Sequence, residues 1–502
     1  MEFVQNFPFI SILLYLSAGV ICNALKPKAA KWYTIFLNAL ICCMMFLVLG
    51  FTMQTNASYV YIMGHFSAPW GNEIRIGVLE AFLATAFSGV TLLTLLGGME
   101  HIFEDCEEQK TNLYFSVANL LMSSMMALIF TNDLFTAYVF VEINTIASCA
   151  LVMLRYRTGK TLVATTHYLI MSLLGSGMFL IGISMLYDLT GHLLMENIAV
   201  SVQNLFVSGN YAFPLTVIIG LFAIGMGVKS ALWPFYFWLP GAHGNATASS
   251  SGILSGIVLK GYIILLIKIF YRVIGLNVIA NNHITNVLFL FGAVAMIVGS
   301  LYAMRERDLK RMLAYSSVAQ IGYVYLGIGI GTHSGMVAAC AQIFIHAITK
   351  TMLFCCAGGF MSVSGGSKKM ADLKGAGLRD PLGGIAFGVG ALSMIGIPLF
   401  SGFITKLYLA TAAIEVMPDR ECVGAIAVIA IVLSTLLNAL YYIPALINLF
   451  TPRADGKFAG CKAKYHWEYL TALIAFIILN LGCGLFSDRI IILIEKGLSM
   501  FA

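Results

Sequence analysis

The stretch that decides the fold is Ala223-Ile-Gly-Met-Gly-Val-Lys229-Ser-Ala-Leu-Trp-Pro234-Phe-Tyr-Phe-Trp-Leu-Pro240. It begins as an apolar helix and places a lysine deep in that helix, five residues before a proline. A lone ammonium group in hydrocarbon costs roughly 3 kcal/mol or more on insertion scales, and a proline leaves backbone carbonyls without partners. Together, these features predict a broken membrane helix with Lys229 as a proton-carrying group near the break.

The composition places the whole chain in a membrane. Of its 502 residues, 60% are hydrophobic and only 10% are charged. Apolar runs of about 20 residues, the length that spans a bilayer, follow one another to the end of the chain. We therefore predict an all-α polytopic membrane protein with about 14 transmembrane helices. The predicted spans lie near 7–24, 32–52, 76–98, 112–130, 133–154, 162–187, 212–238, 247–272, 284–304, 309–330, 334–361, 382–415, 423–450 and 467–494.

The eleven cysteines are scattered along the chain. They form neither a Cys-x-x-Cys pair nor a Cys/His ligand set, and they are typical of small apolar packing residues. We therefore expect no iron–sulfur or zinc site and no cofactor in this chain.

The net charge of +6 does not indicate a nucleic-acid partner, because the basic residues gather in alternate short loops, on one side of the predicted spans. The positive-inside rule places such loops in the cytoplasm. We therefore predict a multi-pass protein of the cell membrane with both termini outside. The loop residues that carry this prediction are Lys26, Lys28, Lys31, Lys110, Arg155, Arg157, Lys160, Arg305, Arg307, Lys310, Arg311, Lys368, Lys369, Lys374, Arg379, Arg453, Lys457, Lys462 and Lys464.

The twelfth predicted span repeats the features of the seventh. It carries Lys406 after Gly396-Ile-Pro398 and Ser401-Gly402. Two Gly/Pro-interrupted spans in corresponding positions, each with a buried lysine, indicate inverted repeats. We predict two inverted five-helix repeats with broken helices 7 and 12. The predicted parts are 1–110 (helices one to three), 111–275 (first repeat), 283–450 (second repeat) and 466–502 (last helix).

Several titratable side chains lie where a bilayer should exclude them. Those central in predicted spans are Glu142, Lys229, Lys260, His346, Lys350 and Lys406. Snorkelling to an interface explains Lys268, which lies near a span end, but it explains the central lysines poorly. His346 has the competing interpretation of a packing histidine, and Lys350, four residues later, shares its helix face.

Burial suggests what these groups do. Desolvation favours the neutral form of a lysine, and an adjacent carboxylate favours the charged form. A buried lysine whose partner can approach or retreat is therefore a switchable proton carrier. Glu142 is the only carboxylate central in a span, which makes it the expected partner of Lys229. Hydroxyls that could line a lateral relay, or simply pack helices together, are Ser148, Thr247, Ser249, Ser250, Ser251 and Ser255.

Seven runs, in order along most of the chain, carry a family resemblance. They are Thr131-Asn-Asp133-Leu-Phe-Thr-Ala-Tyr-Val-Phe-Val-Glu142, Gly227-Val-Lys229-Ser-Ala-Leu-Trp-Pro234, Leu239-Pro-Gly-Ala-His243, Ser255-Gly-Ile-Val-Leu-Lys260, Arg307-Asp-Leu-Lys-Arg-Met-Leu-Ala-Tyr-Ser-Ser-Val-Ala-Gln-Ile-Gly322-Tyr323, His346-Ala-Ile-Thr-Lys350-Thr-Met-Leu-Phe354 and Gly396-Ile-Pro-Leu-Phe-Ser-Gly-Phe-Ile-Thr-Lys406. The combination resembles the antiporter-like subunits of Mrp-type Na+/H+ antiporters, respiratory complex I and membrane-bound hydrogenases. The first run is most similar to the D-type Mrp subunit or its hydrogenase counterpart.

The resemblance implies fourteen core helices, with the seventh and twelfth broken, and a role for each matching residue. Glu142 resembles the fifth-helix glutamate, Lys229 its seventh-helix partner and Lys260 the eighth-helix bridging lysine. His346 and Lys350 resemble the central groups of the eleventh helix, and Lys406 the terminal lysine of the twelfth. Asp133, His243 and Gln320 are candidates for an entrance or a secondary position.

The chain departs from the family pattern in places. The loop that usually reads Leu-Pro-Asp-Ala-His-Ala-Glu-Ala-Pro has Gly241 and Asn245 in place of the two acids and Thr247 in place of the second proline. The cytoplasmic entrance at this loop is therefore unassigned. Gln320 stands where complex I members often have histidine, so we expect no titratable group at that relay position.

The resemblance implies a proton-translocating subunit of a multi-subunit cation/proton antiporter, with H+ moving along a mid-membrane Lys/Glu/His relay. Its implied partners are other membrane subunits, including antiporter-like homologues and small multi-helix subunits, within lipid. Two alternatives stay open: the homologous subunit of an ion-pumping hydrogenase or complex I-like oxidoreductase, and a stand-alone solute transporter. The residues also leave open whether Na+ passes and whether the complex is an enzyme. This chain shows no redox site, so redox chemistry would belong to partners.

Overall fold

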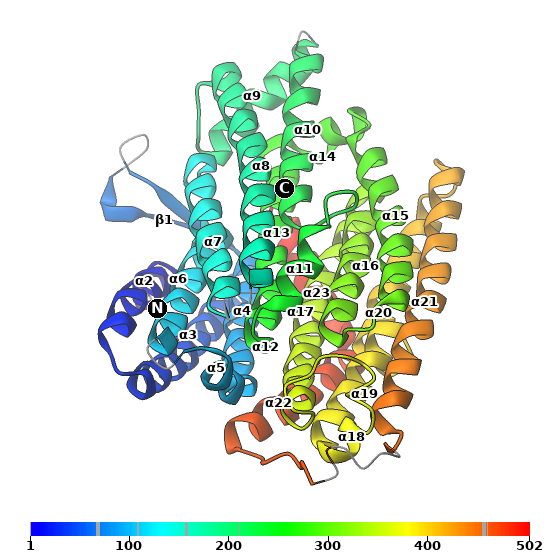
Figure 1. Ribbon diagram of the computed structural model, residues 1–502. Coiled ribbons are helices and arrows are strands. Elements are labelled where there is room, and N and C mark those ends of the chain that lie inside the picture. Colours follow the sequence, from blue (N-terminus) through cyan, green and yellow to red (C-terminus); the bar gives the residue numbers. More distant parts are fainter. Residues whose placement is uncertain are drawn as a thin grey trace.

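The structure is a computed structural model that describes residues 2–66, 71–107, 110–155, 159–209, 211–453, 458 and 460–501. It is a bundle of long helices with a small pair of strands at one side (Figure 1). Arg157 and Lys457, two of the basic residues behind the predicted orientation, lie outside the described residues. The orientation of the termini, the inverted repeats and the four-part division of the chain stay predictions.

Thirteen helices in the described part of the chain are long and apolar enough to cross a membrane. Each coincides with a predicted span, so the polytopic α-helical fold class is confirmed. They are α2 (Phe7–Ala24), α3 (Pro27–Thr55), α4 (Val78–Gly97), α6 (Thr111–Phe130), α7 (Leu134–Met153), α8 (Gly159–Thr190), α10 (Ala212–Lys229), the segment Ala248–Ile274, α15 (Ile284–Arg305), α16 (Leu309–Ile330), α17 (His333–Ser362), α21 (Glu421–Phe450) and α22 (Trp467–Leu485).

The remaining predicted span, 382–415, is divided into α19 (Pro381–Ile395) and α20 (Ser401–Glu415). Within Ala248–Ile274 the elements are α12 (Ala248–Ile253), the π-helical η3 (Leu254–Val258), α13 (Leu259–Lys268) and the π-helical η4 (Ile269–Ile274). The shorter elements are α1 (Glu2–Gln5), β1 (Tyr59–Ile62), η1 (Met63–His65), β2 (Glu73–Ile76), α5 (Met99–Asp105), α9 (Met195–Ser208), α11 (Trp238–Asn245), α14 (Leu276–Asn281), α18 (Ala376–Arg379) and α23 (Ser487–Ser499). Strands β1 and β2 pair antiparallel.

The first break lies where the sequence predicts it. Helix α10 ends at Lys229, and α11 begins at Trp238. Pro234, between them, has no N–H with which to continue a helix. Lys229 therefore occupies the C-terminal end of a half-helix, where the unpaired carbonyls and the helix dipole favour a positive charge.

The second break separates α19 from α20. Gly396 ends α19 with a φ of 91°, a backbone conformation that glycine adopts without steric cost. A methyl group at Gly402 would overlap the carbonyl oxygen of Ser393. The two half-helices therefore approach each other more closely than a larger residue at 402 would allow.

The centre of the bundle is formed by α17 and the Ala248–Ile274 segment, whose most apolar stretches are wholly buried. A helix that is apolar on all sides belongs in an interior. Helix α21 lies at the edge (Figure 1) and exposes Ile429, Leu436 and Ile447. The central helices carry Lys260 and Lys350, so these lysines are enclosed by protein on every side.

The C-terminal span is shorter than predicted. Helix α22 ends at Leu485 rather than near residue 494, and a separate helix, α23, follows it. Helix α23 buries Ile491, Ile494 and Leu498 on one face and packs against α4 and α17. Polar residues at its start, Ser487-Asp-Arg489, interrupt the apolar run, which explains why the chain leaves the α22 direction there.

Candidate functional site: a line of buried lysines

Lys229 is fully buried at the end of α10. Its ammonium donates a hydrogen bond to Oγ1 of Thr145 on α7 (2.5 Å) and lies 5.1 Å from the ring centre of Tyr262 on α13. An aromatic face attracts a cation, and a hydroxyl oxygen accepts from one. Two uncharged groups therefore hold this ammonium in place.

Glu142, the expected partner, lies one helical turn before Thr145 on α7. The two side chains point in similar directions because residues three apart share a helix face. Glu142 is half-buried and is an electrostatic neighbour of Lys229, but the two residues form no ion pair in the described structure. It is Thr145, not Glu142, that contacts the lysine.

Lys260 and Lys350 approach a shared polar seam between the central helices. The ammonium of Lys260 donates to the carbonyl of Ser255, and the Ser255 hydroxyl lies 2.8 Å from the hydroxyl of Ser317 on α16. Ser317 in turn donates to the carbonyl of Leu313 (3.0 Å), which also accepts from the ammonium of Lys350 (2.7 Å). Hydroxyls and carbonyls therefore join the two buried lysines.

Two buried histidines stand beside this seam. His346 is an electrostatic neighbour of both Lys260 and Lys350, and neither of its ring nitrogens has a hydrogen-bond partner within the described residues. The same holds for His243, whose ring stacks on Phe354 with 5.2 Å between centroids. Buried polar nitrogens normally find partners, so these two imidazoles are exceptions among the described residues.

A run of hydroxyls leads away from Lys350. Its ammonium donates to the hydroxyl of Tyr442 on α21 (3.2 Å), which lies 2.9 Å from the hydroxyl of Ser316. The Tyr441 hydroxyl lies 2.9 Å from the hydroxyl of Ser316 and donates to Oδ1 of Asn438 (2.7 Å). Three adjacent hydroxyls therefore connect Lys350 with Asn438.

Lys406 lies at the other end of this run, beside the second break. Its ammonium donates to the carbonyls of Ile395 (2.6 Å) and Met394 (3.0 Å), the last residues of α19, and to Oγ1 of Thr435 (3.3 Å). The side-chain amide of Asn438 donates to the same Met394 carbonyl (3.3 Å). Lys406 is thus held by the C-terminal carbonyls of a half-helix, as the dipole favours.

Gln320 lies outside the run from Lys350 to Lys406. Its side-chain oxygen accepts from Gln342 (2.7 Å), and Oε1 of Gln342 accepts from Thr405 (2.5 Å). The side-chain nitrogen of Gln320 has no partner in the described part of the chain. An amide carries no proton that titrates in this range, so the hydroxyls of Tyr441 and Tyr442 offer the connection that Gln320 does not.

Asp133 has a structural role that the sequence pattern did not assign. Its Oδ1 accepts from the amide of Thr136 (2.7 Å) and caps α7, a common use of aspartate at a helix start. It also lines a cavity of about 470 Å³ together with His192. This cavity lies at the opposite end of α7 from Arg155.

Lys268 does not snorkel as its place near a span end predicts. It is fully buried, and its ammonium donates to the carbonyls of Ile129 (2.6 Å) and Thr131 (2.9 Å) at the end of α6. Carbonyls at the end of a helix have no backbone N–H of that helix to accept from. Lys268 is therefore a helix-end contact between α13 and α6, away from the line that joins Lys260 to Lys406.

Several residues of the site were not identified from the sequence. They are Thr145, Tyr262, Ser316, Ser317, Thr435, Asn438, Tyr441 and Tyr442. Their signal is a polar group inside a predicted span, but that signal is weak. Many buried hydroxyls in these spans bond a carbonyl of their own helix, as Ser88 does. Only the packing of one helix on another shows which hydroxyls join the site and which bond only their own helix.

The arrangement has one chemical property throughout: none of Lys229, Lys260, Lys350 and Lys406 forms an ion pair with a carboxylate in the described structure. Each has neutral acceptors, so each ammonium can lose a proton without leaving an uncompensated carboxylate in contact. Hydrogen-bonding groups follow one another from Lys260 through Lys350 to Lys406, and Thr145 and Tyr262 hold Lys229 separately. This geometry suits lateral proton transfer through the middle of the bundle.

A family model described as NADH:quinone oxidoreductase/Mrp antiporter, transmembrane, matches residues 131–436. That range contains both helix breaks and every buried lysine described above. The chain belongs to this family. Its resemblance to antiporter-like subunits, predicted from sequence motifs, is thereby confirmed.

Two relatives come from two kinds of complex. The N subunit of the NADH-quinone oxidoreductase of Desulforudis audaxviator is 30% identical over 458 residues, covering 88% of this chain and 87% of that protein. The D-type subunit of the Na+/H+ antiporter of Alkalihalophilus pseudofirmus is 29% identical, covering 73% of this chain and 72% of that protein. This chain is therefore homologous both to the D-type subunits of Mrp antiporters and to complex I-like membrane subunits.

Solved structures share the fold. A chain of the membrane-bound sulfane sulfur reductase, an archaeal respiratory membrane complex, superposes with a TM-score of 0.86 at 22% identity, covering 100% of this chain and 98% of that chain. A chain of the Mrp complex from Dietzia sp. DQ12-45-1b gives a TM-score of 0.84 at 21% identity, covering 99% and 97%. At these sequence identities, the two superpositions show a shared fold and nothing further.

Proposed function

We propose that this chain is the proton-translocating membrane subunit of a multi-subunit cation/proton antiporter, similar to the D-type subunit of Mrp antiporters. H+ moves along Glu142, Lys229, Lys260, His346, Lys350 and Lys406. The observation that carries the proposal is the placement of Lys229, Lys260, Lys350 and Lys406, each buried beside neutral acceptors and without an ion-paired carboxylate among the described residues. A charged lysine within a bilayer is costly, so a set of them along the two broken helices and the central helices supports a functional role.

The route has two halves joined at the seam between Ser255 and Ser317. In the first half, a proton passes between Glu142 and Lys229, beside Thr145, and then moves on to Lys260. In the second half, His346 and Lys350 pass it through the hydroxyls of α16 and α21 to Lys406. His243, beside the seam, and Asp133, at the start of α7, are secondary positions, and Gln320 stays outside the route.

The chain works with other membrane subunits. Both solved relatives are multi-subunit membrane complexes, which supports partners that include antiporter-like homologues and small multi-helix subunits. H+ is the transported ion of this chain, and a partner or this chain carries the exchanged cation. We place the protein in the cell membrane, within lipid, with both termini outside and no cofactor of its own.

A second candidate is the homologous subunit of an ion-pumping oxidoreductase. The fold shared with the sulfane sulfur reductase and the 30% identity to an N subunit favour it. The residues in the route would serve the same purpose there, with redox chemistry in partner subunits. A stand-alone solute transporter is a third interpretation, and it predicts transport by the purified single chain.

The test measures proton movement in inverted vesicles that contain the whole complex. Lys350→Ala removes a route member from the centre of the bundle. Because a positioned acid–base group contributes roughly 100-fold or more to a proton transfer, we expect the initial rate to fall by about that factor. Lys464→Ala, in an exposed loop, is the matched control and should leave the rate unchanged. Equal rates for both variants, at equal complex content, would remove the basis of the proposal.

The same vesicles separate the candidate complexes. An antiporter moves H+ in response to an added Na+ gradient without any electron donor. An oxidoreductase moves H+ only while electrons flow. Purification of the tagged chain with its neighbours identifies the complex independently of either activity.

A further inference from the structure

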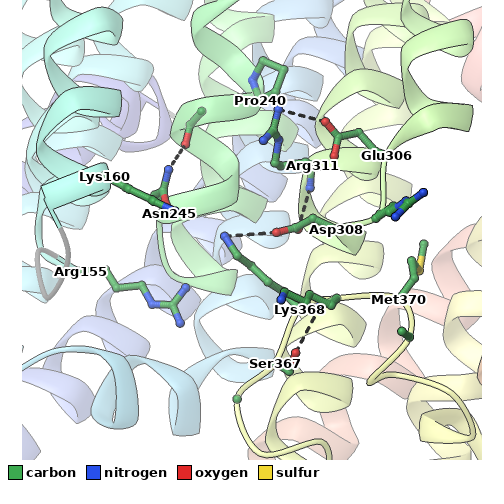
Figure 2. A pocket seen from close by; sticks show the side chains of 15 residues that line it. Arg155, Lys160, Pro240, Asn245, Glu306, Asp308, Arg311, Ser367, Lys368 and Met370 are labelled. Atoms are coloured by element: carbon green, nitrogen blue, oxygen red, sulfur yellow. Dashed lines mark hydrogen bonds and ion pairs between the residues drawn. The ribbon is translucent and has the colours of Figure 1, made fainter.

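A cavity outside the lysine line opens at the end of the bundle where α7 ends and α16 begins. Its volume is about 1020 Å³. Figure 2 shows Arg155 and Lys160 on one side of it, Glu306, Asp308 and Arg311 on another, and Lys368 reaching in between. The walls therefore come from helix ends and loops rather than from the membrane-buried parts of the helices.

The lining of this cavity is strongly basic. Two carboxylates stand among six basic side chains: Arg155, Lys160, Arg307, Arg311, Lys368 and Lys369. Each carboxylate already forms an ion pair with a basic side chain. Glu306 pairs with Arg311 (2.9 Å), and Asp308 pairs with Lys368 (3.2 Å). The lining keeps a formal excess of four positive charges.

Three of these cations have no partner for their charge in the described part of the chain. The side chains of Lys160, Arg307 and Lys369 make no hydrogen bond or ion pair with the described residues, and all three are exposed. Arg155 does pair with Asp105 (3.0 Å), which lies outside the cavity lining. Like charges held around one cavity repel one another, and a bound anion would relieve that repulsion.

The altered loop adds to this excess. Gly241 and Asn245, which stand where the family pattern has two acids, both line the cavity. Two carboxylates there would cut the excess of positive charge by half. A Cβ on Gly241 would meet only the Ala164 methyl at 3.7 Å, an ordinary contact, so space does not explain the absence of a side chain at this position.

We propose that this cavity binds a phosphate group, carried either by the headgroup of an anionic lipid or by a soluble phosphate compound. Arginine and lysine together suit that ligand, since the guanidinium fork matches phosphate oxygens and the ammonium acts as a point charge. The position at helix ends is the depth of lipid headgroups, where basic pockets between membrane helices bind anionic lipids. None of the six residues of the proposed proton route lines this cavity.

The test uses the purified whole complex and two probes. In nanodiscs of phosphatidylcholine mixed with phosphatidylglycerol, native mass spectrometry measures how much phosphatidylglycerol stays bound. In nanodiscs of phosphatidylcholine alone, calorimetry measures the binding of inorganic phosphate. Retained phosphatidylglycerol without phosphate binding assigns the lipid source, and phosphate binding assigns the soluble one. Binding of neither probe overturns the proposal.

Two double variants locate the binding. Lys160→Gln with Lys369→Gln removes two unpaired cations, and because each basic residue near the surface contributes about fivefold, the pair should weaken binding roughly 25-fold. Gly241→Asp with Asn245→Glu adds two carboxylates and should abolish binding. The matched control, Lys462→Gln with Lys464→Gln, removes the same charge from an exposed loop outside the cavity. An equal loss in the control would mean general surface attraction and would overturn the site.

Discussion

Replacing Thr145 with valine tests whether the contact made by Lys229 matters for proton movement. Valine has the shape of threonine without the hydroxyl, so the ammonium loses the acceptor that lies 2.5 Å away. A hydrogen bond to a charged group contributes about 1.5–3 kcal/mol. At about 1.4 kcal/mol per tenfold change, the protonated form of Lys229 becomes roughly 10- to 100-fold less populated relative to the neutral form.

The helix itself should tolerate the change. The Thr145 hydroxyl also donates to the carbonyl of Val141 (2.8 Å), but that carbonyl keeps its backbone partner in α7. Thr145→Ser is the matched control, because it keeps the hydroxyl and loses only a methyl group.

The assay is the initial rate of proton uptake, measured by a fluorescent pH indicator in inverted vesicles of the whole complex at equal subunit content. We expect Thr145→Val to slow uptake by about tenfold or more, and Thr145→Ser to stay near the unmodified rate. If valine and serine gave the same rate, the hydroxyl would not hold a working charge, and the contact with Lys229 would have no part in proton movement.

Three further changes test other parts of the structure. Gly402→Ala should reduce assembly of the subunit in the membrane, seen as less folded protein in detergent, because its methyl would overlap the Ser393 carbonyl oxygen; normal yield would show that the second break can widen. Tyr442→Phe removes the hydroxyl that accepts from Lys350 and should slow proton uptake about tenfold with assembly retained, and an unchanged rate would exclude the hydroxyl run. His243→Phe keeps an aromatic ring against Phe354 and removes both nitrogens that lack a partner among the described residues, so we expect slower uptake with assembly retained; full activity would show that the ring only packs.

The architecture could be predicted because it follows from strong local signals. About twenty apolar residues in a row have few alternatives to a membrane helix, and a proline within such a run favours a break, although α21 continues through Pro444. Both breaks therefore lie beside the residues that cause them, Pro234 and Gly396. The end of the last span was predicted less well, since the amphipathic helix α23 continues the apolar pattern on one face.

The contacts of the candidate site could not be predicted in the same way. Glu142 was expected to pair with Lys229 because both are charges inside spans, yet the hydrogen bond goes to Thr145. Which of two residues one turn apart reaches a neighbouring helix depends on the rotation of both helices, and the sequence does not encode that rotation locally. The Tyr441 and Tyr442 run depends on α16 and α21 being neighbours, which likewise only the packing reveals.

The central claim is that Lys229 works by releasing and taking up a proton. The most direct measurement compares Lys229→Arg with Lys229→Ala for proton uptake in vesicles of the whole complex, at matched assembly. Arginine keeps a positive charge but does not release its proton in the working range. We predict that both variants lose uptake to a similar extent. Uptake retained by the arginine variant and lost by the alanine variant would contradict the claim, because a fixed charge would then be sufficient.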